Sequence, residues 1–294
     1  MSLEPTSLRQ PAGREGNPLR NMGPTLLFCP ANRGDRYAKA LSLSHSVILD
    51  LEDAVPPAER SAAREMIGRA FGTHDRPGTL DPDRVIVRVN PVDSDAGQED
   101  LDALSRTRCR QVMVAKAERP WGPGALTEFG VVALIETLQG LDRIDSIAAQ
   151  NNCSGLMWGG DDFTADLGGR ASRRDDGSLL PHAEMLRLAV LVAAQRHGRV
   201  AIDGPSLNIA DIHALGREAT EAAAMGFVAK AAVHPKQVEV ISAAFAPGPD
   251  QVERARRIVA AAEASGGGVV MLDGLMVDGP VVRQARAVLT ARYG

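Results

Sequence analysis

Eight short runs of aliphatic and β-branched residues recur along the chain, and the longer stretches between them repeat their apolar residues at a helical period. Such short apolar runs are typical of strands buried on both faces of a parallel sheet. The runs are 25–29, 47–51, 85–89, 111–115, 131–135, 155–158, 199–202 and 226–230. Eight strands separated by helices predict a TIM (β/α)8 barrel; a doubly wound open sheet is the alternative, because alternation alone does not show closure.

The intervening stretches are rich in alanine, leucine and charged residues, which favours outer helices. We expect these helices at 57–71, 140–151, 181–197, 209–225, 234–245 and 251–264.

The end of the chain has a different pattern. Asp273-Gly274 lies between two short apolar runs, which is a strong type I′ hairpin signal, and Pro280 suits the first turn of a last helix. The apolar stripe of that helix needs a partner surface, such as a neighbouring subunit. We therefore expect a disordered tail at 1–22, a catalytic barrel at 23–264 and a hairpin-helix arm at 265–294.

Composition excludes several classes of function. Hydrophobic residues make up 44% of the 294 residues and charged residues 24%, which is ordinary for a globular protein. The apolar runs fall short of the roughly 18 residues that a membrane span needs, and a net charge of −4 argues against a nucleic-acid partner. Three scattered cysteines are typical of a reducing compartment. These features predict a soluble cytoplasmic protein.

Carboxylates gather where the expected strands end, which is where TIM barrels assemble their active sites. Mg²⁺ prefers oxygen ligands and commonly takes only one or two protein carboxylates. Glu136 and Asp162 follow neighbouring strands, so they are the candidate metal ligands. The alternative is that each of them caps the helix that follows it.

Arg88 lies within an otherwise apolar strand, where an unpaired guanidinium would be costly. It could bind a substrate carboxylate or an enolate oxygen, or it could form a structural ion pair with Asp50 or Glu52. Asn90 and Lys116 follow the third and fourth strands and are further candidate substrate contacts.

Eight motifs in a fixed order carry a family resemblance. They are 47–54 (VILDLEDA), 87–91 (VRVNP), 133–137 (ALIET), 159–168 (GGDDFTADLG), 201–204 (AIDG), 226–230 (GFVAK), 233–237 (VHPKQ) and 272–278 (LDGLMVD). With these motifs the chain resembles the citrate lyase β-subunit family, within the wider group of malyl- and citramalyl-CoA lyases and HpcH/HpaI-type aldolases.

The resemblance implies a barrel in which Glu136 and Asp162 hold Mg²⁺ while Arg88 and Glu136 contact the substrate. Asp53 stands where the aldolases of the group have a histidine base, which favours the lyase branch. The resemblance also implies that the C-terminal arm offers Asp278 to a neighbouring subunit; the plainer alternative is a helix N-cap. The residue that moves the proton is left open between Asp53 and Asp278.

The implied activity is cleavage of a citryl-, citramalyl- or malyl-type thioester into a keto acid, such as oxaloacetate, and an acetyl thioester. The acyl group would be bound as a thioester to coenzyme A or to an acyl carrier protein. A homo-oligomer is expected, and the resemblance suggests a trimer or hexamer.

Two other functions are compatible with the sequence. A Schiff-base aldolase could use Lys116 or Lys230, both at strand ends. A non-catalytic subunit could keep the pocket without turnover; Ala115, Val228 and Leu275 differ from the residues that relatives commonly carry and keep this second possibility open.

Overall fold

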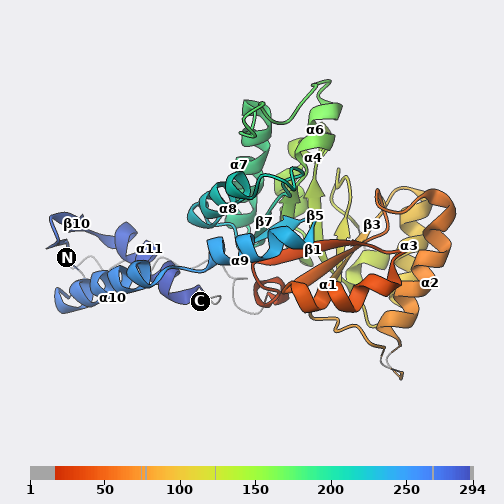
Figure 1. Ribbon diagram of the computed structural model, residues 1–294, viewed down its shortest axis with the longest axis horizontal. Helices are drawn as coiled ribbons and strands as arrows, with labels where there is room; N and C mark the ends of the chain where they lie inside the picture. Colours follow the sequence, from red (N-terminus) through yellow and green to blue (C-terminus); the bar gives the residue numbers. More distant parts are fainter. Residues whose placement is uncertain (1–16, 74, 77, 123, 267, 292–294) are drawn as a thin grey trace, which may run out of the picture. The chain divides into compact units, whose positions relative to one another are not determined.

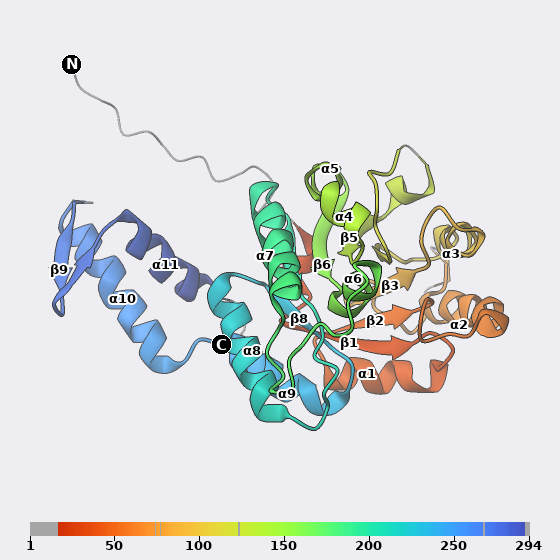
Figure 2. The same ribbon diagram turned by 90° about the horizontal axis from the view of Figure 1, so that it is seen from above.

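The computed structural model describes residues 17–73, 75–76, 78–122, 124–266 and 268–291. Each of the eight apolar runs overlaps one of eight parallel strands, the last only at residues 229–230, and β8 pairs with β1 to close the sheet into a barrel (Figures 1 and 2). This confirms the predicted TIM-type barrel and excludes the open sheet. The strands are β1 (Thr25–Pro30), β2 (Ser46–Asp50), β3 (Val85–Val89), β4 (Gln111–Val114), β5 (Gly130–Ile135), β6 (Cys153–Trp158), β7 (Val200–Asp203) and β8 (Ala229–Ala232).

Side chains that alternate along the strands fill the inside of the barrel, because successive residues of a strand point to opposite faces. Ile48, Ile86 and Leu134 belong to this core with residues from the other strands, and all three are almost fully buried. Leu19 and Met22 also pack in this core. Leu19 belongs to a 3-10 helix, η1 (Pro18–Asn21), and Met22 follows it directly. Residues 17–22 of the tail expected at 1–22 are therefore part of the folded barrel unit, and residues 1–16 of it lie outside the described residues.

Helices follow most strands and cover the barrel; α2 and α3 lie side by side, and α7 packs against β6 and β7 (Figures 1 and 2). The helix expected at 140–151 is two shorter helices with a break at Arg143, whose backbone is not helical. The α-helices up to residue 245 are α1 (Tyr37–Leu43), α2 (Arg60–Phe71), α3 (Asp95–Ser105), α4 (Leu138–Asp142), α5 (Ile144–Ala148), α6 (Gly160–Asp166), α7 (Pro181–Arg196), α8 (Ile212–Met225) and α9 (Val238–Phe245). Four further 3-10 turns are η2 (Gly34–Arg36), η3 (Pro57–Glu59), η4 (Ala125–Glu128) and η5 (Pro235–Gln237).

The chain divides into two compact units, Met1–Ile241 and Ser242–Gly294. In the second unit, α10 (Pro249–Ala264) packs on α11 (Gly279–Thr290), and β9 (Val270–Leu272) pairs with β10 (Leu275–Val277). Asp273 and Gly274 both have positive φ, at 51° and 77°, as the two central residues of a type I′ turn require. The expected hairpin is present, and α10 belongs to the same unit as the arm.

Candidate active site

The inward face of the barrel changes from apolar to charged at the carboxyl ends of the strands. Asp50, Arg88 and Glu136 each lie two positions beyond an inward core residue, namely Ile48, Ile86 and Leu134. Because alternation has a period of two, these polar side chains continue the same face. All three are buried. The strand pattern thus directs one cation and two carboxylates toward one end of the barrel.

Arg88 is held by the residues that follow β2. Its Nε and Nη2 donate to the two carboxylate oxygens of Asp50 at 2.7 and 2.6 Å, and its Nη1 lies 2.8 Å from Glu52 Oε2. The guanidinium also lies 5.2 Å from the ring centroid of Phe28. Although burial acts to lower the pKa of Arg88, the hydrogen bonds and charge of Asp50 raise it above its ordinary value. Both structural ion pairs considered from the sequence are therefore present.

Glu52 joins Arg88 to a second cation. Its Oε1 accepts from Lys116 Nζ at 2.5 Å, and Lys116 Nζ is also 3.4 Å from Asp162 Oδ1. Burial raises the pKa of Glu52, and the two cations oppose this rise. Burial acts to lower the pKa of Lys116, but the hydrogen bond to Glu52 holds it above its ordinary range. The amine of Lys116 consequently stays protonated, which does not suit a Schiff-base nucleophile.

Glu136 is 2% exposed, and its Oε1 accepts a hydrogen bond of 2.9 Å from the backbone N–H of Lys116. Lys116 has a φ of 48°, an uncommon value for a side-chain-bearing residue. Burial, followed by the charges of Glu52 and Asp162, raises the pKa of Glu136 to about 8. On its other side, a Cβ added to Gly159 would lie 2.4 Å from Glu136 Oε2. Glycine at this position leaves the space that the carboxylate occupies.

Asp162 comes from the first turn of α6, which begins directly after β6 and Gly159. Its side chain is 41% exposed. Neither candidate ligand caps a helix: Thr137 caps α4, and Gly159 is the N-cap of α6. The helix-cap alternative for Glu136 and Asp162 is therefore wrong.

Within the described ranges, no group of three or more His, Cys, Asp or Glu side chains is arranged to hold a metal ion. The pair Glu136 and Asp162 nevertheless suits Mg²⁺, which takes one or two carboxylates and leaves its other positions to water and substrate. One observation supports the fit. Glu136 is buried, and the negative charges of Glu52 and Asp162 raise its pKa further, so a bound cation would offset the negative charge gathered there.

Three other predicted site residues have different surroundings. The side-chain amide of Asn90 donates to Leu51 O and to Asp100 Oδ2, so its donors are committed within the fold. Asp53 is 63% exposed and lies 3.6 Å from Arg88 Nη1. Asp278 lies in the second unit and caps α11 by accepting from Val281 N at 3.2 Å.

Lys230 lies outside the inner face of the barrel. Its neighbours Ala229 and Ala231 belong to the inner core, so its side chain points toward the helices. The fully buried ammonium donates to Asp203 Oδ2, Gly204 O and Glu218 Oε1 at 2.9, 2.6 and 2.7 Å. All three donors are used, which leaves this lysine unsuited to a Schiff base.

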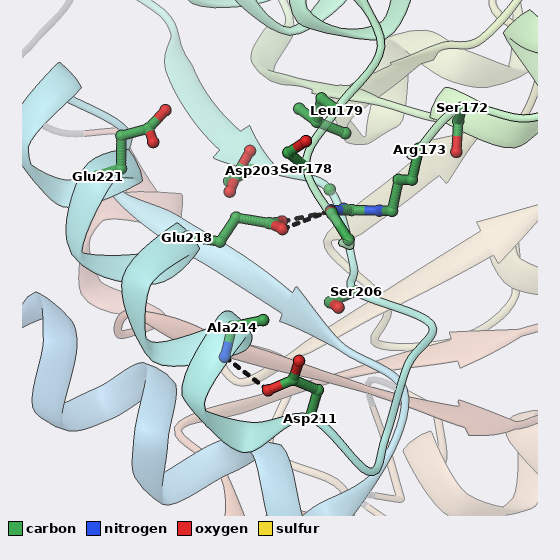
Figure 3. A network of polar contacts seen from close by, with 12 residues as sticks. Ser172, Arg173, Ser178, Leu179, Asp203, Ser206, Asp211, Ala214, Glu218 and Glu221 are labelled. Atoms are coloured by element: carbon green, nitrogen blue, oxygen red, sulfur yellow. Dashed lines mark hydrogen bonds and ion pairs between the residues drawn. The ribbon is translucent and has the colours of Figure 1, made fainter. Parts of the chain in front are cut away.

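The same network contains residues that the sequence analysis did not single out. Arg187 of α7 donates to Asp203. Arg173, in the loop before α7, forms an ion pair with Glu218 of α8 (Figure 3). Arg187 lies on the buried apolar face of α7 with Leu186, Val190 and Leu191. One charged residue on an otherwise apolar helical face was the signal available in the sequence.

The chain is similar to known proteins in both sequence and structure. Residues 25–235 match the HpcH/HpaI aldolase/citrate lyase model. The chain is 41% identical to a citrate lyase subunit beta-like protein of Mycobacterium tuberculosis, over 92% of this chain and 96% of that protein. It is 32% identical to a (3S)-malyl-CoA thioesterase of Cereibacter sphaeroides, over 90% and 93% of the two chains.

A solved structure of the protein CitE from M. tuberculosis, in complex with magnesium, acetoacetate and coenzyme A, matches with a TM-score of 0.85. Its sequence is 40% identical, and the match covers 92% of this chain and 98% of that one. The sequence match, the closed barrel and the order of the motifs together place this chain in the HpcH/HpaI aldolase/citrate lyase family.

Proposed function

We propose that the chain is a Mg²⁺-dependent carbon–carbon lyase that cleaves a citryl-, citramalyl- or malyl-type thioester into a keto acid and an acetyl thioester. The observation that carries this proposal is the grouping of buried Glu136 with Asp162, Glu52, Lys116 and Arg88 at one end of the barrel. The CitE structure supports the metal and the thioester handle, since it holds magnesium, acetoacetate and coenzyme A. A solved structure of a citrate lyase beta subunit from M. tuberculosis, 41% identical over 78% of this chain, is a complex with oxaloacetate and magnesium.

Glu136 and Asp162 would hold the metal. When bound, Mg²⁺ supplies Lewis-acid chemistry, polarising a substrate oxygen and neutralising developing negative charge. Glu136 is suited to this role because the Lys116 amide holds its Oε1, and the absence of a side chain at Gly159 leaves room for its Oε2. A ligand fixed in this way loses little conformational entropy when it binds.

Cleavage of the bond between a hydroxyl-bearing carbon and the carbon α to the thioester produces an enolate, whose charge the site must stabilise. Arg88 is the buried cation available for this task. Asp50 accepts from Nε and Nη2, and Glu52 Oε2 lies 2.8 Å from Nη1, so the second N–H of Nη1 and the second N–H of Nη2 would face the substrate. Lys116, which is partly exposed, would bind the carboxylate of the keto-acid half.

The hydroxyl proton must pass to a carboxylate, and one proton must then be delivered to the α-carbon of the enolate to give the acetyl thioester. Asp53 is exposed beside Arg88 and could accept it within the same chain. Asp278 of a neighbouring copy is the other candidate, since the arm is expected to pack on a second subunit. Separate substitution of each by asparagine decides between them: the variant that loses kcat while retaining thioester binding identifies the proton acceptor.

A panel of citryl-, citramalyl- and malyl-thioesters, on coenzyme A and on an acyl carrier protein, tests the function by mass spectrometry of the products. We expect a keto acid with an acetyl thioester, formed with Mg²⁺ and lost in excess chelator. Cleavage that persists in chelator contradicts the metal requirement. A free hydroxy acid and free thiol instead indicate a thioesterase, the activity named for the C. sphaeroides relative. Binding without turnover across the panel indicates the non-catalytic alternative.

A further inference from the structure

The first turn of α6 carries Asp162 but has little local support. The helix has seven residues, its N-cap Gly159 provides no side-chain hydrogen bond, and it begins at Gly160. So short a helix is marginal by itself, and two consecutive glycines leave its entry conformationally free. The direction of the Asp162 carboxylate must therefore be fixed by contacts from elsewhere in the fold.

The loop between α6 and α7, residues 167–180, provides one such contact. Ser172 is buried, and its hydroxyl donates to Asp161 Oδ1 at 2.5 Å, next to Asp162 in the chain. The loop forms a small hairpin, because Arg173 and Leu179 form an antiparallel β-bridge. Beside it, the backbone N–H of Leu180 donates to Ser172 O at 2.8 Å. This hairpin gives Ser172 a defined position.

A charged network attaches the hairpin to the barrel. Arg173 Nη1 and Nη2 form a two-pronged ion pair with Glu218 of α8 at 2.7 and 3.1 Å (Figure 3). Glu218 also accepts from the buried Lys230, which pairs with Asp203. Asp203 in turn accepts from the indole N–H of Trp158, the last residue of β6. The network thus connects the hairpin to the strand from which α6 begins.

We propose that Ser172 and Arg173 are positioning residues of the metal site. Arg173 anchors the 167–180 loop on Glu218, and Ser172 holds Asp161, so that the first turn of α6 presents Asp162 toward Glu136. This inference rests on the proposed function, because Asp162 is a metal ligand only there. It assigns a role to a buried network that the proposed reaction does not use.

The test compares Ser172→Ala with Ser178→Ala, a matched substitution in the same loop whose hydroxyl donates to Asp176 and accepts from Arg174, both within that loop. Isothermal titration measures the affinity of each purified full-length variant for Mg²⁺. We expect Ser172→Ala and Arg173→Met each to weaken Mg²⁺ binding by about tenfold, the lower range for outer-shell partners, and Ser178→Ala to change it by less than about twofold. At saturating Mg²⁺, Ser172→Ala should regain a kcat within about twofold of the unsubstituted protein, because only the position of a ligand is altered.

A second readout needs no metal. In chelator, the amides of 160–166 should exchange hydrogen faster in Ser172→Ala than in Ser178→Ala. Equal Mg²⁺ affinity and equal exchange in the two serine variants would overturn the proposal. Asp162→Asn separates the positioning role of Ser172 from the metal site itself. If it abolishes Mg²⁺ binding while Ser172→Ala has no effect, only the positioning role fails. If it binds Mg²⁺ normally, the proposed metal site fails and the positioning role with it.

Discussion

The carboxylate of Glu136 titrates far from its ordinary range in the metal-free protein, because it is buried near Glu52 and Asp162. Its pKa rises from 4.5 to about 8, so the folded chain holds a proton that the unfolded chain has already lost at neutral pH. By linkage, the stability that Glu136 contributes is fully present below pH 4.5 and is lost as the pH rises through about 8. Mg²⁺ reverses this preference, since it requires the ionised carboxylate.

Mg²⁺ affinity should consequently depend on pH. Below a pH of about 8 a proton competes for Glu136, so we expect the Kd for Mg²⁺ to fall about tenfold per pH unit between roughly pH 6 and 8, and then to level off. Isothermal titration across this range measures the dependence, and Glu136→Gln, which lacks the ligand carboxylate, should show no Mg²⁺ binding at any of these pH values. A Kd that is equal at both ends of the range would show that Glu136 is not a titrating ligand.

Replacement of Gly159 should damage the site without strain in the backbone. Gly159 has φ −120°, which alanine adopts readily, so the effect of Gly159→Ala must come from its Cβ, placed 2.4 Å from Glu136 Oε2. We expect Mg²⁺ affinity to fall about tenfold or more, by analogy with the loss of an outer-shell partner. Gly68→Ala is the control, because its Cβ would meet no atom within 4 Å. Similar affinities of the two variants would contradict this role of Gly159.

The sequence is enough to propose Glu136, Asp162 and Arg88 as site residues, because Glu136 and Asp162 follow apolar runs and Arg88 lies within one. It could not show how their neighbours use their hydrogen bonds. Asn90 follows β3 as a substrate contact might, yet the side chain of Asp100 in α3 engages its amide. The close approach of Gly159 to Glu136 likewise depends on two strands meeting in space.

Among the elements, β7, β8, α7 and α8 are joined by charge as well as by apolar packing. Lys230 and Asp203 are fully buried and pair with each other, with Glu218 and Arg187 completing the group. Although burial alone would raise the pKa of Asp203, the charges of Lys230 and Arg187 lower it. Such a group is costly to break, because removal of one partner leaves a buried charge without compensation.

Substitution of Lys230 by methionine should therefore destabilise the fold. We expect the free energy of unfolding to fall by about 3–5 kcal/mol, the usual cost of breaking a buried ion pair. Urea denaturation measures it, and Lys236→Met, at an exposed position of η5, is the matched control with a change near zero. A loss below about 1 kcal/mol in Lys230→Met would mean that the network contributes little to stability.

The strands were predictable because each is a dense apolar run. Helices were harder where local and tertiary signals differ. The expected helix at 140–151 breaks at Arg143, although its apolar residues Ile144 and Ile147 stay buried. Helix α6 is too short to leave a periodic pattern, and its ends are set by Gly159 and by contacts with the following loop.

The hairpin of the second unit exposes several large apolar side chains. Met271, Leu275 and Met276 of the hairpin are 68, 53 and 60% exposed. Exposed apolar residues gathered on one small element favour an interaction surface. This agrees with the expectation that the arm packs on a neighbouring copy in a homo-oligomer.

Charges placed on the hairpin should weaken that association. Light scattering after size-exclusion chromatography should show an oligomer for the unsubstituted chain and a shift toward monomer for Met271→Lys combined with Met276→Lys. The circular dichroism spectrum should stay the same, since both positions are exposed. An unchanged oligomer in the double variant, or a monomer in the unsubstituted chain, would refute the packing role of the hairpin.

The position of a bound metal ion decides whether Glu136 and Asp162 are its ligands. Mn²⁺, which takes the same oxygen ligands as Mg²⁺, can be located in crystals by its anomalous scattering. We expect one strong peak within about 2.0–2.3 Å of carboxylate oxygens of both Glu136 and Asp162. The same peak should be absent from crystals of Glu136→Gln. A peak at other residues, or none in crystals soaked at millimolar Mn²⁺, would contradict a metal site built by these two carboxylates.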